Sequence, residues 1–353
     1  MHIIKRKQIL EGVKVSNLIE YYVQGHTGKG YVNYINSNLQ QIDRIILLKN
    51  RNPFIITNIL KRIKKEFAEQ QIEVIKSIDS TNIIEGIIIR ELSLAVLNER
   101  IYKEKDEKVT IMKVAIQSDY VPKYDLENIK ANQEKAHQHF VKGLSIHEKL
   151  EKIYISEMNF SKADKVINNL LTEIFSQVKK ENKESIIYER LFGTNTPDGI
   201  VNTVPSLIKP IQKKVFILGR AGTGKSYLMN KILEKCIELG KDVELYRCSL
   251  DPNSIDMLII RQLGVCLHDN TSPHVVSTEY NNKKIIDMYK ETVNQSAEIK
   301  NEAKIEELKK RYKKEMKTGL HYLQQYKVQH LNCPIKDDEI IVYQLIKKMK
   351  NIE

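Results

Sequence analysis

Eight residues in the second half of the chain, Gly219 to Ser226, have the types and spacing needed to hold phosphate groups. The segment GRAGTGKS matches the pattern Gly-x-x-x-x-Gly-Lys-Ser/Thr at every fixed position. Glycines let the backbone turn sharply and approach a polyphosphate, which the backbone N–H groups and the helix dipole attract. Lys225 would contact the terminal phosphates, and the Ser226 hydroxyl would bind Mg²⁺. We therefore predict a site for ATP and Mg²⁺ made by Gly219, Arg220, Ala221, Gly222, Thr223, Gly224, Lys225, Ser226 and Tyr227.

A bound metal ion also needs a carboxylate, and three acidic residues follow predicted strands. Asp269 ends the run LGVCLHD, a loose Walker B pattern, because His268 rather than an apolar residue precedes it. Asp251 and Asp256 lie in SLDPNSID, after another strand, where open α/β sheets place their ligands. Asp269 and Asp251 could equally be turn residues. The prediction is that Lys225, Asp251 and Asp269 carry catalysis and that Ser226 and Asp269 hold the metal.

The phosphate loop requires a strand before it and a helix after it. KKVFIL precedes the loop as a buried strand, and residues 226–239 show helical apolar spacing that ends at Gly240. A second strand over 243–248 and an apolar run over 258–267 follow. Strands alternating with helices of this length are typical of a parallel sheet in an α/β fold.

The same order of elements occurs twice, at a common offset of 169 residues. GYVNYINSNLQ from Gly30 aligns with GIVNTVPSLIK from Gly199, and after a slip of two residues Arg90 aligns with Arg261. We predict an α/β protein of two duplicated P-loop NTPase domains, each a parallel sheet flanked by helices. Each copy continues into a long helical arm and a last helix, DKVINNLL or DEIIVYQL, which we expect to pack on its own core. The boundaries are residues 1–184 and 185–353, with arms at about 123–180 and about 284–330.

The first copy lacks a phosphate loop. At offset 169 its residues are NRNPFIIT, Asn50 to Thr57, with no glycine and with Ile56 in the place of the lysine. Pro53 removes an N–H donor, and Phe54 is bulky where the backbone should approach phosphate. We therefore predict one working nucleotide site per chain, in the second half.

Composition indicates a cytoplasmic protein. The 353 residues are 41% hydrophobic and 29% charged, which excludes collagen-like and disordered classes. Four scattered cysteines fit no disulfide framework, MHIIKRKQILEG lacks the apolar stretch of a signal peptide, and no apolar run approaches the ~20 residues of a membrane span. Cys248, Cys266, His268 and His274 match no usual zinc spacing, so we expect His274 to line the nucleotide or substrate pocket.

The formal net charge of +12 raises the question of a nucleic-acid partner. The segment KKRYKKEMK, residues 309–317, is basic, and Tyr312 could stack on a base. Interleaved acids at Glu306, Glu307 and Glu315 favour a solvated helix face instead. Nucleic acid is therefore the weaker expectation, a nucleoside triphosphate is the favoured ligand, and the helical arms offer a surface for a protein partner or self-association.

Several of these segments resemble a bacterial ATPase family with two tandem P-loop NTPase domains. The resemblance rests on GRAGTGKSYLMNKI from Gly219, CSLDPNSIDMLIIRQLGV from Cys248, HDNTSPHVV from His268 and GTNTPDG from Gly193, and in the first half on YYVQGHTGKGYVNYINSNL. It implies ATP binding and hydrolysis and supplies no substrate. The family's first domain also carries a P-loop, which is degenerate here, and the first copy has no counterpart of HDNTSPH. A two-site mechanism is therefore not expected.

Three functions fit these observations, and we favour the first. It is a Mg²⁺-dependent ATPase with one working site, whose hydrolysis moves the arms. The second is a small-molecule or nucleotide kinase with the arms as a lid and SLDPNSID holding an acceptor hydroxyl. The third is a nucleotide-sensing scaffold or nucleic-acid accessory with little turnover. Arg220 or Arg261 could stabilise developing charge, although a counterpart of Arg261 in the first copy favours a structural role.

Overall fold

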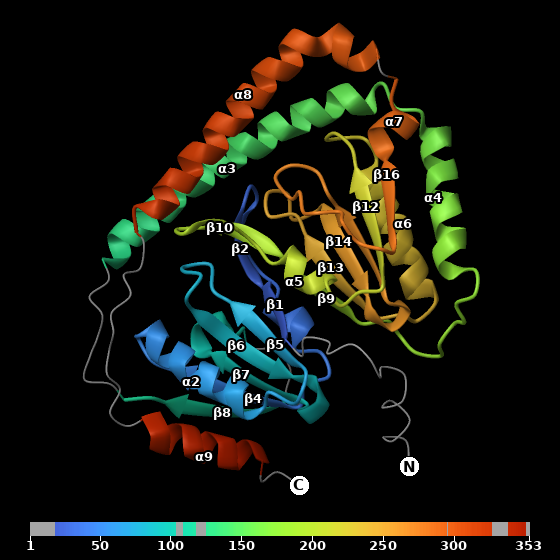
Figure 1. Cartoon of the computed structure of the whole chain (residues 1–353). Coiled ribbons are helices and arrows are strands. Elements are labelled where there is room, and N and C mark those ends of the chain that lie inside the picture. Colours follow the sequence, from blue (N-terminus) through green and yellow to red (C-terminus); the bar gives the residue numbers. More distant parts are fainter. Residues whose placement is uncertain (1–17, 104–108, 118–124, 295, 327–337, 351–353) are drawn as a thin grey trace.

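The computed structural model describes residues 18–103, 109–117, 125–294, 296–326 and 338–350. Two α/β halves lie next to each other and are bridged by a pair of long helices (Figure 1). Both halves contain equivalent strands in the same spatial order, which confirms the predicted duplication. The segment MHIIKRKQILEG and the ends of the predicted arms at 123–124 and 327–330 lie outside the described residues.

The first half is built on a six-stranded sheet of order β1-β5-β6-β7-β4-β8. Strand β6 runs antiparallel to both of its neighbours, and the other pairs are parallel. The central strands are Ile- and Val-rich because helices or the other half bury both of their faces. The bounds are Leu18–Tyr22 (β1), Ile72–Lys76 (β5), Ile84–Ile89 (β6), Leu94–Asn98 (β7), Arg44–Lys49 (β4) and Thr110–Ala115 (β8).

The second half repeats this sheet with the order β9-β13-β14-β15-β12-β16. Its strands are Ile187–Arg190 (β9), Val243–Arg247 (β13), Ile255–Ile260 (β14), Val265–Asp269 (β15), Lys213–Leu218 (β12) and Lys283–Asp287 (β16). Here β14 is the antiparallel strand. Both sheets are therefore mixed, and the expectation of parallel sheets is wrong at β6 and β14. The connections 77–83 and 248–254 are shorter than the dozen or more residues that a parallel crossover needs.

The apolar run predicted over 258–267 is two strands rather than one. A 3-10 turn, Arg261–Leu263 (η4), separates β14 from β15, and Gly264 follows it with φ +63°. In the first copy the equivalent turn is Arg90–Leu92 (η2), followed by Ser93 with φ +49°. The apolar spacing continues through the turn, so the pattern alone does not reveal the reversal.

An approximate twofold axis relates the halves. Tyr22 and Leu191 hold equivalent positions and exchange backbone hydrogen bonds, at 2.8 and 2.9 Å. Near them lie two β-hairpins and two short helices, with the bounds Gln24–Thr27 (β2), Gly30–Asn33 (β3), Ile35–Asn38 (α1), Gly193–Thr196 (β10), Gly199–Asn202 (β11) and Val204–Ile208 (α5). The two halves therefore meet as the subunits of a symmetric dimer would.

One hydrophobic core is shared by both halves, and it contains a buried ionic cluster. Leu47 of the first half and Phe216 of the second belong to this core. The fully buried Arg190 lies 2.7 Å from a Glu73 carboxylate oxygen and 3.1 Å from one of Glu244. Burial alone would raise the pKa of Glu73, but Arg190 and Arg90 lower it to about 2. Glu244 in turn pairs with Arg261 and Glu73 with Arg90, so Arg261 has the structural role that its counterpart indicates.

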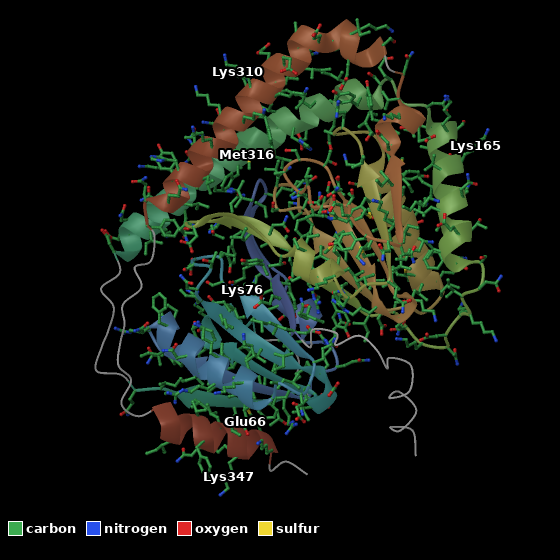
Figure 2. All side chains as sticks on the ribbon, in the orientation of Figure 1. Glu66, Lys76, Lys165, Lys310, Met316 and Lys347 are labelled. Atoms are coloured by element: carbon green, nitrogen blue, oxygen red, sulfur yellow. The ribbon has the colours of Figure 1, made fainter. Side chains whose placement is uncertain are left out.

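Two long helices form the predicted arms and pack against each other in antiparallel fashion. They are Leu126–Ile155 (α3) and Ser296–Gln324 (α8) (Figure 1). Gly319 lets the Phe140 ring approach closely, since a Cβ there would lie 2.6 Å from it. Met316 points from α8 toward α3, where Gly143 leaves it room (Figure 2). No helix within the described ranges is long and apolar enough to cross a membrane.

The last helix of each copy packs on the other copy, contrary to the expectation stated above. Helix Phe160–Phe175 (α4) contributes to the core of the second sheet, beside helix Lys225–Glu238 (α6) and Met288–Thr292 (α7). Helix Asp338–Lys350 (α9) packs on the first sheet beside Pro53–Glu66 (α2) (Figure 1). Because each arm is long enough to cross the interface, the two copies exchange their final helices.

Candidate functional site

The phosphate-loop segment forms a turn between β12 and α6. Residues 219–224 connect Leu218 to Lys225, where α6 begins. Gly222 and Gly224 have φ +74° and +83°, a backbone region that favours glycine. Lys225 turns back over the loop, and its Nζ donates to the Arg220 carbonyl oxygen at 2.7 Å. The segment is thus a glycine-rich loop at the N-terminus of a helix, as its pattern predicts.

Asp269 lies beside this lysine. It ends β15, which pairs directly with β12. Asp269 Oδ2 is 3.6 Å from Lys225 Nζ, and the side chains are only 14% and 12% exposed. Asp269 Oδ1 accepts hydrogen bonds from the Thr271 N–H and hydroxyl. A loop lysine and a strand-end carboxylate therefore meet at one edge of the sheet.

Asp251 contacts the first half instead. Its Oδ1 is 2.9 Å from Lys29 Nζ at the tip of the β2–β3 hairpin, and it also accepts from the Asn253 N–H at 3.1 Å. Asp198, which holds the position of Lys29 in the second copy, accepts from the Thr81 N–H at 2.8 Å. These reciprocal contacts favour a turn and a junction between halves as the role of Asp251, the alternative that the sequence leaves open.

The remaining residues of the predicted site lie on the loop and the first turn of α6. Thr223 Oγ donates to the Arg220 carbonyl oxygen at 2.8 Å and so ties the loop to itself. Ser226 is half-buried in the first turn of α6. Tyr227 is 46% exposed, and its hydroxyl donates to Asp164 on α4 at 3.4 Å. Tyr227 is thus oriented toward the exchanged helix.

Both arms contact the phosphate loop. A Cβ on Gly222 would lie 2.4 Å from the backbone oxygen of Glu151 on α3. Ala221 packs against the apolar cluster that α3 and α8 form between them. Arg220 Nε donates to Glu298 on α8 at 2.8 Å. The sequence gives no signal for these contacts, because the periodicity of a polar helix does not say where the helix docks.

Three further side chains meet at the same edge of the sheet. Because β14 runs antiparallel, its residue Asp256 lies near Cys248, which follows β13, and near His274 in the loop after β15. Burial raises the pKa of Asp256 to about 6, with His274 acting in the opposite direction. His274 thus lies beside Asp256, and its expected contact with a nucleotide or substrate stays a prediction. Asp256, the second acid of SLDPNSID and not among the predicted catalytic or metal residues, has a carboxylate oxygen within 4.8 Å of ligand atoms of both His274 and Cys248.

The first copy has no counterpart of the glycine-rich loop 219–224 or of Asp269. Only residues 50–52 connect β4 to α2, three fewer than the 219–224 loop, so Pro53 rather than Ile56 occupies the first helical position. Asn98 occupies the place of Asp269 and donates to Glu85 at 2.9 Å. The first half therefore has a shorter, glycine-free connection at this point, and its lack of a nucleotide site stays a prediction.

Other residues singled out by the sequence have structural surroundings. Cys266 belongs to the shared core, and the buried His268 packs edge-on against Phe192. Burial lowers the pKa of His268 to about 4. Tyr312 packs in the α3–α8 contact with its ring near that of His147, so its ring is not free to stack on a base.

No protein-family model, curated protein or solved structure matches this chain significantly, so its function is inferred from its own residues.

Proposed function

We propose that the second half of the chain binds one Mg²⁺–ATP at Gly219–Ser226 and hydrolyses it. The observation that carries this proposal is Lys225, which ends a glycine-rich loop 3.6 Å from Asp269 on the adjacent strand. In loops of this type the lysine neutralises the terminal phosphates, and a carboxylate on a neighbouring strand helps hold the metal. The same reasoning supports membership of the tandem P-loop ATPase family that the motifs resemble.

The residues present suit a magnesium ion. The Ser226 hydroxyl and the Asp269 carboxylate would hold it, and oxygen ligands of this kind are what Mg²⁺ prefers, with waters completing its shell. The ion would neutralise charge on the phosphates. Lys225 now contacts loop carbonyls and Asp269. Phosphate oxygens would replace the carbonyl contacts, while the backbone N–H groups of the loop and the dipole of α6 hold the same charge.

The contacts of the loop with both arms link the site to the rest of the molecule. Gly222 abuts the α3 backbone, and Arg220 pairs with Glu298 of α8. A loop that changes conformation around phosphates must change these contacts too. Hydrolysis would therefore shift α3 and α8, and through them α4 and α9 on the opposite halves.

Equilibrium titration with Mg²⁺–ATP tests the site. Lys225→Ala should weaken binding by ~10-fold to more than 100-fold, because hydrogen bonds to charged groups contribute about 1.5–3 kcal/mol each. Lys235→Ala is the matched control, since Lys235 lies on the same helix and its ion pair within the described chain is with the surface residue Glu238. Equal affinity of Lys225→Ala and the native chain would refute the site.

Release of inorganic phosphate tests the reaction. The proposal predicts release from Mg²⁺–ATP without an added acceptor, and loss of that release in Asp269→Asn. Turnover only in the presence of hydroxyl-bearing acceptors would refute hydrolysis and indicate a kinase that transfers the phosphoryl group to the acceptor. ATP binding without turnover would leave the nucleotide site in place and refute the proposed hydrolysis.

A further inference from the structure

Three potential metal ligands converge beside the proposed nucleotide site. They come from three separate segments: Cys248 follows β13, Asp256 lies on β14, and His274 is in the loop after β15. One ligand atom from each lies within 4.8 Å of the others. His274 Nε2 is 3.3 Å from Asp256 Oδ2.

The described residues satisfy the buried Asp256 carboxylate only in part. It is 6% exposed, and its Oδ2 accepts no hydrogen bond from the described part of the chain. A buried carboxylate is costly unless a cation balances it and hydrogen bonds satisfy its oxygens. His274 is its ion-pair partner and carries a positive charge only when protonated. Among the described residues, no lysine or arginine forms an ion pair with Asp256.

The first copy shows how the same position is balanced without a metal. Glu85 occupies the place of Asp256 and is fully buried. Arg100, a permanent cation, donates to it from Nε at 3.0 Å. In the second copy Thr271 replaces that arginine, and Cys248 replaces Ser77. The second copy therefore has threonine in place of the fixed cation and a thiol in place of the serine hydroxyl, and the first copy has no histidine at the position of His274.

We propose that Cys248, Asp256 and His274 bind one divalent transition-metal cation of the Zn²⁺ class. Zn²⁺ binds thiolate, imidazole and carboxylate ligands at about 2.0–2.3 Å, which places tetrahedral ligand atoms roughly 3.3–3.6 Å apart. The distance between His274 Nε2 and Asp256 Oδ2 matches that separation. Three protein ligands leave a fourth position for water or a substrate oxygen. Sulfur and nitrogen ligands disfavour Mg²⁺, so this site is separate from the proposed magnesium.

Titration of the full chain with Co²⁺, in place of Zn²⁺, tests this proposal. The protein is purified under reducing conditions, stripped with a chelator and titrated without nucleotide, so the outcome does not depend on ATP binding. We expect one equivalent of Co²⁺ to give the visible bands of tetrahedral cobalt and a sulfur-to-cobalt charge-transfer band, and Zn²⁺ to displace it. Cys248→Ser should abolish the charge-transfer band. Cys248→Ser and His274→Gln should each weaken affinity by more than ~100-fold, since even outer-shell changes cost about 10–100-fold.

Asp251→Asn is the matched control. Asp251 lies three residues after Cys248, and its side chain pairs with Lys29 while only its backbone contacts the Cys248 sulfur, so the Asp251→Asn variant should bind Co²⁺ as the native chain does. Thermal unfolding checks that each variant folds, and Zn²⁺ should raise the melting temperature of the native chain and of Asp251→Asn only. Absence of the charge-transfer band in the native chain, or its persistence in Cys248→Ser, would overturn the proposal.

Discussion

Replacing Gly222 by alanine tests how α3 is seated on the phosphate loop. The added Cβ would lie 2.4 Å from the Glu151 oxygen, whereas ordinary contact begins at 3.4 Å. The loop or the backbone of α3 must therefore move by about 1 Å. Left-handed backbone costs a residue other than glycine about 1–2 kcal/mol, and overpacking adds about 1–3 kcal/mol. We expect the free energy of unfolding to fall by about 2–5 kcal/mol and ATP binding to weaken.

Gly264→Ser is the matched control for backbone strain. Gly264 has φ +63°, and a Cβ there would meet only the flexible side chain of Gln212, at 3.2 Å. Ser93 already occupies this position in the first copy, so the variant should lose at most about 1–2 kcal/mol and bind ATP normally. Urea unfolding followed by circular dichroism gives both free energies. If the free energy of unfolding fell equally in Gly222→Ala and Gly264→Ser, the close contact between Gly222 and the backbone of α3 would be refuted.

The helix exchange and the buried ionic cluster give further predictions. Ile167→Ala on α4 should lower the free energy of unfolding by about 2–5 kcal/mol and speed amide hydrogen exchange in β12 of the second half. Leu345→Ala on α9 should have the same effects on stability and on β4 of the first half. Faster hydrogen exchange in the opposite strands would contradict the swap of the final helices between the halves. The pKa of Glu73 is lowered to about 2 in the folded chain, and a glutamate in the unfolded chain has a pKa of about 4.3. The ionised Glu73 therefore stabilises the fold fully above pH ~4.3, and this stabilisation is lost as the pH falls from there toward 2. In Glu73→Gln the free energy of unfolding should vary less over that interval. If the free energy of unfolding of Glu73→Gln depended on pH as strongly as that of the native chain, the stabilising role of ionised Glu73 would be contradicted.

Much of the fold was open to prediction because it depends on local patterns. The duplication follows from matched residues such as Arg90 and Arg261, both of which hold a buried glutamate. The loop at Gly219 follows from its glycines, and the loss of that loop in the first copy follows from Pro53. The antiparallel strands β6 and β14 were missed, because uninterrupted apolar spacing hides the 3-10 turns that reverse the chain.

Contacts between distant segments could not be predicted. The apolar face of α4 requires a sheet to cover it, and either of two similar sheets would satisfy that requirement; the length of α3 decides which one does. The contacts of α3 and α8 with the glycine-rich loop 219–224 likewise depend on which sheet α4 covers. Cys248, Asp256 and His274 come from separate segments, so no ligand spacing in the sequence reveals their convergence.

The number of ATP molecules bound per chain tests the central claim most directly. Titration of the native chain with Mg²⁺ and a non-hydrolysable ATP analogue should give one equivalent, since the glycine-rich loop proposed to bind the phosphates occurs in the second half and not in the first. Lys225→Ala should remove that equivalent, and Lys235→Ala should retain it. Two equivalents in the native chain, or one equivalent of undiminished affinity in Lys225→Ala, would contradict a single site at Gly219–Ser226.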